Sequence, residues 1–595
     1  MNETERPLTI PAALRRAAAS AGDHPAYIEV RGSSERSVTW RELADRARAF
    51  AAGLVGLGLA KGDRVAICAE NGIDWLTAFL GTVTAGGAGV LVYYDLRTAE
   101  IEDQVGRPEC RFLVASASVL PRLPADLPAL ERVIVIDGEA SEGAVPPQLP
   151  FEALIDGESA EAGDVLAGRE PAPEDLAALI FTSGTTGGAK GVMLSHRNFL
   201  ANAHAVLAAL DVGGRDVLLL VLPLHHAMPL MAAVVLPTLV GAQVVIENDL
   251  RRVRDRIQAY RPTVFFGVPA LYEIVYRNVL ARAEAEGRLP TLQRWQARLG
   301  AIKRVTGLNL APLLFRPVHK ALGGRLRFLV SGGAALNPET ARDFAGLGLP
   351  LLQGWGMSEA SPTIAIQRFS RRRFLLGHYY ERHAGSVGEP LPGVEVRLVD
   401  LPEKDIRVAD YGEGEVVVRG ENVFQGYWQA PEATAAALRD GWLYTGDLGR
   451  IDAEGNIWLT GRSKYIIVLD SGEKVHPDEL EEKLARSELI EDVCVLGRKA
   501  RDRTQVTAVI YPRVEAIRQA AAAQGTDLSE AGVRSLIGAE AERLGQELAA
   551  YKRVGRIELS DAPLPKTALR KVARGQVADD YAFDLERWLA SAAAT

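Results

Sequence analysis

The chain has 595 residues, of which 48% are hydrophobic and 24% are charged, the usual balance of a globular protein with a large core. Its length corresponds to about three to four domains. The formal net charge of −8 argues against a nucleic-acid partner. The three cysteines (Cys68, Cys110 and Cys494) lack metal-binding spacing and the N-terminus lacks an apolar signal segment, so we expect a cytoplasmic location.

Helix and strand patterns alternate through the first part of the chain. Residues 39–59 and 75–87 have the apolar spacing of helices, and residues 63–69 have the composition of a short buried strand. Strands that alternate with helices are typical of sheets covered by helices. The sequence therefore predicts an α/β fold with helix-flanked β-sheets in a large N-terminal domain.

Residues 181–191 read FTSGTTGGAKG and lie between an apolar strand at 176–181 and a second strand at 191–196. Glycines let the backbone approach a ligand closely, while free N–H groups and hydroxyls donate hydrogen bonds to its oxygens. Lys190 adds a positive charge. The spacing does not fit the GxxxxGK[ST] loop. The segment therefore predicts a different kind of polyphosphate-binding loop, with a flexible surface loop as the alternative.

Residues 217–246 contain no Asp, Glu, Lys or Arg and resemble a membrane span in composition. Three prolines and the pair His225–His226 interrupt the segment, whereas a spanning helix needs about 20 predominantly apolar residues. We instead expect a strand at 217–222, a buried helix at about 230–239 and a strand at 242–247. The two histidines are either structural or in contact with a ligand.

Residues 271–322 predict long helices. Leu271, Ile274, Val275 and Val279 recur at helical spacing on one face, and a basic amphipathic portion follows. Such an insertion between α/β elements is compatible with a role in binding an apolar ligand.

Residues 368–385 interleave five arginines with aromatic side chains before the final HAG. Clustered basic charge beside apolar rings suits contact with an anionic membrane or with a carrier protein. A plain solvated insertion is the alternative.

The sequence pattern changes near residue 461. Short strands and a DAEGN turn (452–456) precede this point, and HPDELEEKLARS (476–487) begins a helix after it. We therefore expect an N-terminal domain at 1–461 and a small α+β C-terminal domain at 462–595.

Five further motifs follow along the chain. They are SGGAALNPE (331–339), QGWGMSEASP (353–362) with Glu359, YTGDLGRID (444–452) with Asp447, GRSK (461–464) with Arg462, and LPKTALRKVAR (564–574) with Lys571. From the residues alone, the alternatives to a binding role are a strand-to-helix turn capped by Asn337, a buried structural glutamate, surface salt bridges and an exposed basic tail. A single carboxylate suffices for Mg²⁺ when substrate phosphates supply the other ligands. An aspartate can accept hydrogen bonds from two ribose hydroxyls.

Over about residues 25–575, the order of these motifs resembles the adenylate-forming superfamily of acyl-CoA synthetases, luciferases and peptide-synthetase adenylation domains. Four positions depart from the usual signatures: Ala189 replaces proline, Trp355 tyrosine, Ser358 threonine and Arg570 glycine. Glycine allows positive φ more readily than arginine, so Arg570 puts the backbone of its loop in question.

The resemblance implies roles for individual residues. The expected nucleotide-binding residues are Thr182, Ser183, Gly184, Thr185, Thr186, Gly187, Lys190, Gly333, Ala334, Gln353, Gly354, Trp355, Gly356, Met357, Ser358, Asp447, Arg462 and Lys571. The expected catalytic residues are Lys571, Thr182, Glu359 and His226, the expected Mg²⁺ ligands are Glu359 and Thr185, and the expected hinge is Lys464. The C-terminal domain is expected to be mobile about that hinge.

The resemblance further implies an ATP-dependent, AMP-forming ligase that activates an acid as acyl-AMP and transfers it to a thiol. The form VLDSGEKV of the hinge loop resembles long-chain fatty acid–CoA ligases, so we expect a fatty acid, ATP, Mg²⁺ and coenzyme A. Alternatives are an acyl carrier protein as the acceptor, a fatty acyl-AMP ligase, an aryl-CoA ligase, and a non-catalytic nucleotide-binding regulator. Peripheral membrane contact is a further expectation, and the sequence does not define an oligomeric state.

Overall fold

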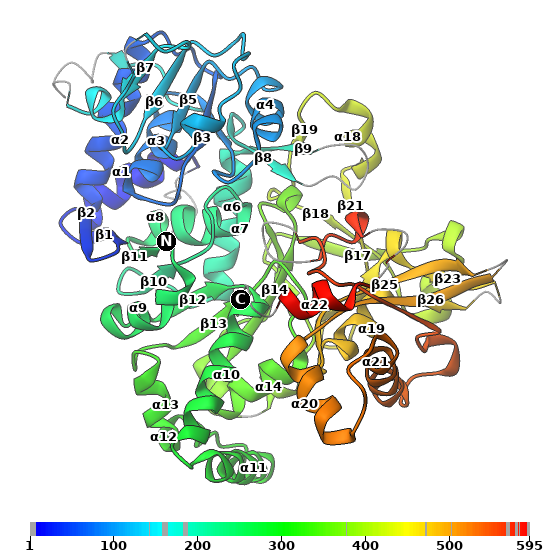
Figure 1. Cartoon of the computed structure of the whole chain (residues 1–595). Helices are drawn as coiled ribbons and strands as arrows, with labels where there is room; N and C mark the ends of the chain where they lie inside the picture. The colour runs from blue at the N-terminus through cyan, green and yellow to red at the C-terminus, as the bar shows by residue number, and fades with distance from the viewer. Residues whose placement is uncertain are drawn as a thin grey trace. The chain divides into compact units, whose positions relative to one another are not determined.

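The computed structural model describes residues 8–141, 143–156, 165–182, 189–376, 378–470, 473–500, 503–566, 572–577, 581 and 583–591. The chain forms two compact units (Figure 1). Unit 1 comprises Met1–Val396 and Val418–Leu443, and unit 2 comprises Arg397–Val417 and Tyr444–Thr595. The strands β17 (Glu395–Val399), β18 (Gly414–Arg419) and β21 (Trp442–Ile451) contain the points where the chain passes from one unit to the other. A functional domain border at 461/462 stays a prediction.

Unit 1 contains an eight-stranded sheet with the order β19-β9-β8-β4-β3-β5-β6-β7. The strands from β8 to β7 are parallel, whereas β9 is antiparallel to both β8 and β19. The strand bounds are β3 (Arg64–Cys68), β4 (Ala88–Leu91), β5 (Phe112–Ala115), β6 (Arg132–Val135), β7 (Gln148–Pro150), β8 (Leu176–Thr182), β9 (Lys190–Ser195) and β19 (Gly426–Tyr427). The expected strands at 63–69, 176–181 and 191–196 are confirmed.

A nine-stranded sheet in unit 1 has the order β16-β15-β14-β13-β12-β10-β11-β1-β2 and is parallel from β14 to β1. Its strand bounds are β1 (Pro25–Arg31), β2 (Ser34–Thr39), β10 (Val217–Leu220), β11 (Gln243–Glu247), β12 (Val264–Gly267), β13 (Phe328–Ser331), β14 (Leu351–Gly356), β15 (Thr363–Ile366) and β16 (Glu389–Pro390). The central strands are buried along their length, as expected for a sheet covered on both faces.

Helices alternate with the strands along the chain. Their bounds are α1 (Ile10–Ala21), α2 (Trp40–Gly56), α3 (Ile73–Thr84), α4 (Thr98–Gly106), α6 (His196–Ala209), α9 (Val253–Tyr260), α10 (Pro269–Ala285), α11 (Leu289–Thr306), α12 (Ala311–Leu314), α13 (Arg316–Ala321), α14 (Pro338–Gly346), α15 (Arg371–Leu375), α16 (Tyr379–Arg382), α17 (Val408–Tyr411, in unit 2) and α18 (Pro431–Ala437). A capping box between Thr39 and Glu42 begins α2 and satisfies N–H groups at its first turn. The helices expected at 39–59 and 75–87 are confirmed.

The uncharged segment at 217–246 folds into the sheet and a buried helix. The helix runs through α7 (Ala227–Leu230), a π-helical turn (Met231–Val235) and α8 (Leu236–Val240), and it ends at Gly241 with a φ of 73°. Among the described residues, no helix has both the length and the apolarity needed to cross a bilayer.

The helical insertion predicted at 271–322 is present as α10 to α13. Its predicted apolar face was partly wrong, because Ile274 is 44% exposed whereas Tyr272 is only 1% exposed. The Tyr272 hydroxyl is bonded at 2.8 Å to the carbonyl oxygens of Phe265 and Val330, which lets a polar aromatic residue occupy the core.

Unit 2 has a core formed by a three-stranded sheet in the order β25-β26-β27 and by helices. The elements of unit 2 from residue 457 onward are β22 (Ile457–Arg462), β23 (Ile467–Val468), β24 (Lys474–Val475), α19 (Pro477–Leu484), β25 (Ile490–Ala500), β26 (Arg503–Pro512), α20 (Val514–Gln524), α21 (Glu530–Gly545), β27 (Arg556–Leu559) and α22 (Leu585–Ser591). The predicted helix at 476–487 is thus confirmed.

Candidate active site

The expected phosphate loop starts and ends at two paired strands of unit 1. Thr182 at the end of β8 is the register partner of Lys190 at the start of β9, and its hydroxyl donates to the Lys190 carbonyl at 3.5 Å. These strands fix both ends of the loop. Ser183, Gly184, Thr185, Thr186 and Gly187 lie outside the described residues, so their expected contacts stay predictions.

Tyr427 on β19 joins two of the expected site residues. Its hydroxyl donates a hydrogen bond of 2.7 Å to Glu359 Oε1, and the Lys190 ammonium lies 5.1 Å from the centroid of its ring. Glu359 is 7% exposed, and the Phe424 N–H donates to its carbonyl oxygen at 2.9 Å. Burial and the neighbouring Glu359 raise the pKa of Tyr427 above its usual range, so the hydroxyl stays protonated and remains a donor.

Tyr427 was not among the site residues predicted from the sequence. It lies 68 residues from Glu359 along the chain and reaches the site because β19 pairs with β9, which carries Lys190. The aromatic pair in GYW (426–428) was a weak signal for such a contact.

The segment around Glu359 depends on close packing of the backbone. A Cβ atom at Gly356 would lie 1.9 Å from the Pro362 carbonyl oxygen, so this position accepts only glycine without rearrangement. Trp355, on the preceding strand, is 8% exposed. Gly354 belongs to the same strand, whereas Met357 and Ser358 form the turn that leads to Glu359.

Ser331 and Gln353 are register partners near the ends of the parallel strands β13 and β14. Ser331 Oγ and Gln353 Oε1 are buried and have no hydrogen-bond partner among the described residues. Gly333, with a φ of 78°, and Ala334 follow directly after β13. Ligands of open α/β sheets bind at this carboxyl edge of the strands, so the two side chains can bind a polar ligand.

The neighbouring segment has an ordinary structural role. Asn337 caps helix α14 by accepting a hydrogen bond of 2.9 Å from the Glu339 N–H. Residues 331–339 therefore contain a strand-to-helix turn with Asn337 as its cap.

His225 and His226 lie in the loop after β10. Their ring centroids are 3.9 Å apart, and the His225 ring lies 4.5 Å from that of Tyr93. Burial lowers the pKa of His226 to about 4 and that of His225 well below its usual value. Both imidazoles are thus neutral near pH 7. His226 Nε2 is buried without a partner among the described residues, so this atom can accept or donate one hydrogen bond.

An apolar cavity of about 10 Å³ lies between β10 and the π-helical turn. These two elements come just before and just after the two histidines in the sequence. Its lining includes Leu218, Leu220, Met228, Ala232 and Phe266. The volume is about that of one water molecule, so an acyl chain could enter only if side chains moved. Met228 is flexible enough to move in this way.

Unit 2 holds Asp447 and Arg462 as register partners on β21 and β22. Arg462 Nε lies 2.8 Å from Asp447 Oδ1, and the Asp447 side chain is 6% exposed. The Asp447 N–H donates to the Thr445 hydroxyl at 3.1 Å, which fixes the adjacent backbone. The carboxylate is therefore oriented, as a residue that binds a diol requires.

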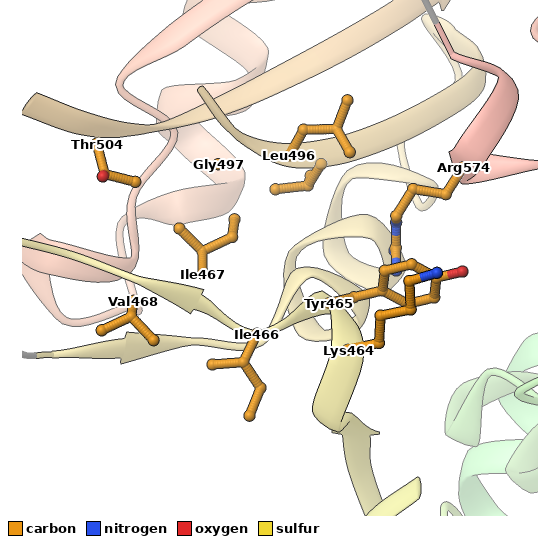
Figure 2. A pocket seen from close by; sticks show the side chains of 10 residues that line it. Lys464, Tyr465, Ile466, Ile467, Val468, Leu496, Gly497, Thr504 and Arg574 are labelled. Carbon is orange, nitrogen blue, oxygen red and sulfur yellow. The ribbon is translucent and has the colours of Figure 1, made fainter. Parts of the chain in front are cut away.

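The expected hinge residue, Lys464, lines a cavity of about 280 Å³ within unit 2 (Figure 2). The guanidinium of Arg574 lies 4.5 Å from the ring centroid of the adjacent Tyr465. Arg574 also pairs with Asp478 at 3.1 Å and with Glu481 at 2.6 Å on α19. One arginine near the C-terminus thus joins Tyr465 to helix α19, and it was not among the predicted site residues.

Lys571 lies outside the described residues. The residues on either side of this segment, Lys566 and Val572, form an antiparallel β-bridge. Lys566 Nζ also pairs with Asp492 Oδ1 at 2.7 Å. The described parts of LPKTALRKVAR are therefore anchored to unit 2, and the role of Lys571 stays a prediction.

The described residues contain no group of three or more His, Cys, Asp or Glu side chains able to hold a metal ion. A lone buried carboxylate at Glu359, with one oxygen bonded to Tyr427, fits the small protein contribution that Mg²⁺ needs beside substrate phosphates.

Two family models match the chain: AMP-binding enzyme over residues 14–428 and AMP-binding enzyme C-terminal domain over residues 464–592. The chain is 32% identical to the long-chain-fatty-acid–CoA ligase FadD15 of Mycobacterium bovis, over 77% of this chain and 75% of the relative. It is 29% identical to the long-chain-fatty-acid–CoA ligase 1 of Homo sapiens, over 81% of this chain and 70% of the relative. The chain belongs to the AMP-binding enzyme family of adenylate-forming ligases.

Solved structures have the same fold. ATP-bound MatB from Rhodopseudomonas palustris matches with a TM-score of 0.67 and 27% identity, over 95% of this chain and 97% of that one. A Mycobacterium tuberculosis fatty acyl CoA synthetase matches with a TM-score of 0.63 and 23% identity, over 95% and 97%. The predicted α/β fold of the acyl-CoA synthetase and luciferase type is confirmed.

Proposed function

We propose that this chain is an AMP-forming fatty acid–CoA ligase that uses ATP, Mg²⁺ and coenzyme A. The contact of Lys190 and Glu359 with the same residue, Tyr427, carries the proposal. A cation and a carboxylate that contact the same side chain support a site for Mg²⁺ and polyphosphate. The apolar lining of the cavity beside Met228 and the relatives named long-chain-fatty-acid–CoA ligases support a fatty acid as the substrate.

In the first half-reaction, a carboxylate oxygen of the fatty acid bonds to the α-phosphorus of ATP, and pyrophosphate leaves. Lys190 and the residues of 182–188 bind the phosphates, while Glu359 would hold Mg²⁺, which would neutralise phosphate charge when bound. Lys571 pairs with the acid and the α-phosphate. Charge crowding dominates this barrier, so positioned cations and N–H donors account for the catalysis.

In the second half-reaction, the thiol sulfur of coenzyme A bonds to the acyl carbon, and AMP leaves. Asp447 and Arg462 bind the ribose hydroxyls, and Lys464 acts as the pivot for the exchange of conformations between the two steps. The neutral His226 donates or accepts one hydrogen bond at the acid.

An acid panel tests this proposal. Pyrophosphate release is measured with ATP and with fatty, aryl and dicarboxylic acids, with and without coenzyme A, and the products are identified by mass. We expect acyl-CoA from medium or long fatty acids. Thioester formed only from aryl acids would favour an aryl-CoA ligase, and acyl-AMP that never passes to coenzyme A would favour an acyl-AMP or carrier-protein ligase. No turnover with any acid would favour a nucleotide-binding regulator.

A further inference from the structure

Exposed apolar side chains gather at one end of the helical insertion of unit 1. Nine of the eighteen exposed large hydrophobic residues found in the described part of the chain fall within 295–314 and 375–376. The leucine patch, as we name it, comprises Val305, Leu308, Leu310, Leu313, Leu314, Leu375 and Leu376. Val305 is 87% exposed and Leu313 is 61% exposed, which is unusual for a soluble surface when such residues lie together.

Backbone contacts bring the two sequence segments of the leucine patch together. Leu308 and Leu376 form an antiparallel β-bridge. The Asn309 N–H donates to the Leu375 carbonyl at 2.9 Å, and the Asn309 side-chain amide donates to the Phe374 carbonyl at 3.2 Å. The leucines on either side of Asn309 are therefore held outward by a buried polar residue.

The opposite side of α11 is fixed to the body of unit 1. Leu299 packs with Phe315 and Leu347, and the 5%-exposed Lys303 forms an ion pair with Glu381. Val305 follows Lys303 by two residues, about 200° around the helix, and so points away from this anchor. Figure 1 shows α11 and α12 at the lower end of unit 1, beyond the strands of the nine-stranded sheet.

Basic side chains are frequent in the two sequence segments that carry the leucine patch. Residues 287–338 contain nine Lys or Arg and no Asp or Glu, and residues 368–380 contain four arginines and no acid, in a chain of net charge −8. Arg304, Arg316, Arg371 and Arg372 are exposed and lie within a few residues of the exposed leucines. Exposed arginines close in sequence to exposed aliphatic side chains complement a surface with negative headgroups above hydrocarbon.

We propose that the leucine patch and its arginines dock this protein on the surface of an anionic lipid bilayer. The aliphatic side chains enter the interface, and the guanidinium groups bind lipid phosphates. An acidic carrier protein would match the arginines, but it would not call for aliphatic side chains as exposed as Val305 and Leu313. The inference does not depend on which acid the enzyme activates.

Vesicle flotation of the full chain tests the proposal. Three variants are compared with the wild type: Val305→Ser/Leu313→Ser/Leu376→Ser, Arg304→Gln/Arg371→Gln/Arg372→Gln, and the control Leu250→Ser/Arg251→Gln/Arg252→Gln. The control removes a leucine that is 39% exposed and two arginines that pair with Asp249. Thermal unfolding confirms that each variant is folded.

We expect the wild type and the control to float with phosphatidylglycerol vesicles and not with phosphatidylcholine vesicles, with binding weakened by high salt. Basic residues near an anionic surface strengthen binding to it, so the arginine variant should bind at least about tenfold more weakly. The leucine variant should lose flotation. Unchanged flotation of either folded variant overturns the proposal. The proposal is also overturned if a variant still floats with the vesicles but no longer transfers the acyl group to an acyl carrier protein.

Discussion

The hydroxyl of Tyr427 donates a hydrogen bond of 2.7 Å to Glu359 Oε1, and this bond links the ladder that carries Lys190 to the turn that carries the expected Mg²⁺ ligand. The bond leaves the second carboxylate oxygen of Glu359 for a metal. It also fixes the plane of the carboxylate, because the tyrosine is itself held in a short β-ladder.

Glu359→Gln should abolish Mg²⁺-dependent pyrophosphate release, because the amide has the same shape but no charge for the metal. Folding should be retained and is checked by thermal unfolding. A variant that remains fully active would remove Glu359 from the metal site.

Tyr427→Phe should weaken apparent Mg²⁺ affinity by roughly 10-fold or more, the scale for losing a residue that orients a metal ligand. The measurement is pyrophosphate release as a function of Mg²⁺ concentration. Tyr411→Phe, at a tyrosine that is 63% exposed, is the control and should behave as wild type. An unchanged Mg²⁺ dependence in Tyr427→Phe would mean that Tyr427 has only a structural role.

The general fold was predictable because periodic apolar patterns and turn residues are local features of the sequence. The strands at 63–69 and 242–247 and the helix at 39–59 were identified in this way. Lys190, Glu359, Asp447 and Arg462 were identified because they stand in short ordered motifs, although their roles stay proposals.

Contacts between distant segments were not predictable. Tyr427 and Arg574 contact partners 68 and 93 residues away in the sequence, and no local pattern predicts which residues those partners are. Asp447 pairs with Arg462 because the ladder of β21 and β22 contains a bulge between Leu448 and Gly449, which shifts the register. The exposure of Ile274 also depends on packing. Helical spacing predicts which residues share one face of a helix, but it does not predict which other elements cover that face.

Acid should destabilise the protein through His196, whose Nδ1 accepts a hydrogen bond of 3.2 Å from the Ile10 N–H. Burial lowers the pKa of His196 from 6.5 to about 4, so between these values the unfolded chain binds the extra proton and the folded chain does not. Stability is therefore complete above pH 6.5 and falls as the pH falls towards 4, by up to about 3 kcal/mol from this residue.

Denaturant unfolding from pH 7 to pH 4 measures this effect in the wild type and in His196→Gln, which keeps an acceptor but cannot be protonated. The variant should lose less stability on acidification. Parallel pH profiles for the two proteins would refute the assignment to His196.

Arg574→Met should destabilise unit 2, because Glu481 and Asp478 would lose the cation that compensates them. Desolvation already raises the pKa of Glu481. Removing one member of a buried ion pair costs roughly 3–5 kcal/mol. Urea unfolding should show this loss, and Arg574→Met/Glu481→Met should recover part of it. A double variant no more stable than the single one would show that the pairing is not the cause.

Lys571→Ala and Lys464→Pro should separate the two half-reactions. Lys571→Ala should slow acyl-AMP formation by roughly 10² or more, the effect of losing one positioned electrostatic group, and should leave thioester formation from pre-made acyl-AMP near the wild-type rate. Lys464→Pro restricts φ at the expected hinge and should do the reverse. Single-turnover assays of each step measure both, and equal damage to both steps by Lys571→Ala would contradict the assignment.

The central claim is that the acid is activated by bonding to the α-phosphate of ATP. It is tested most directly with a fatty acid whose carboxylate oxygens are both a heavy isotope, incubated with the enzyme, ATP, Mg²⁺ and coenzyme A. If acyl-AMP is the intermediate, one heavy oxygen stays on phosphorus when the thiol displaces AMP, so the mass of the AMP must show one heavy oxygen. Unlabelled AMP, or heavy oxygen in inorganic phosphate with release of ADP, would contradict the mechanism.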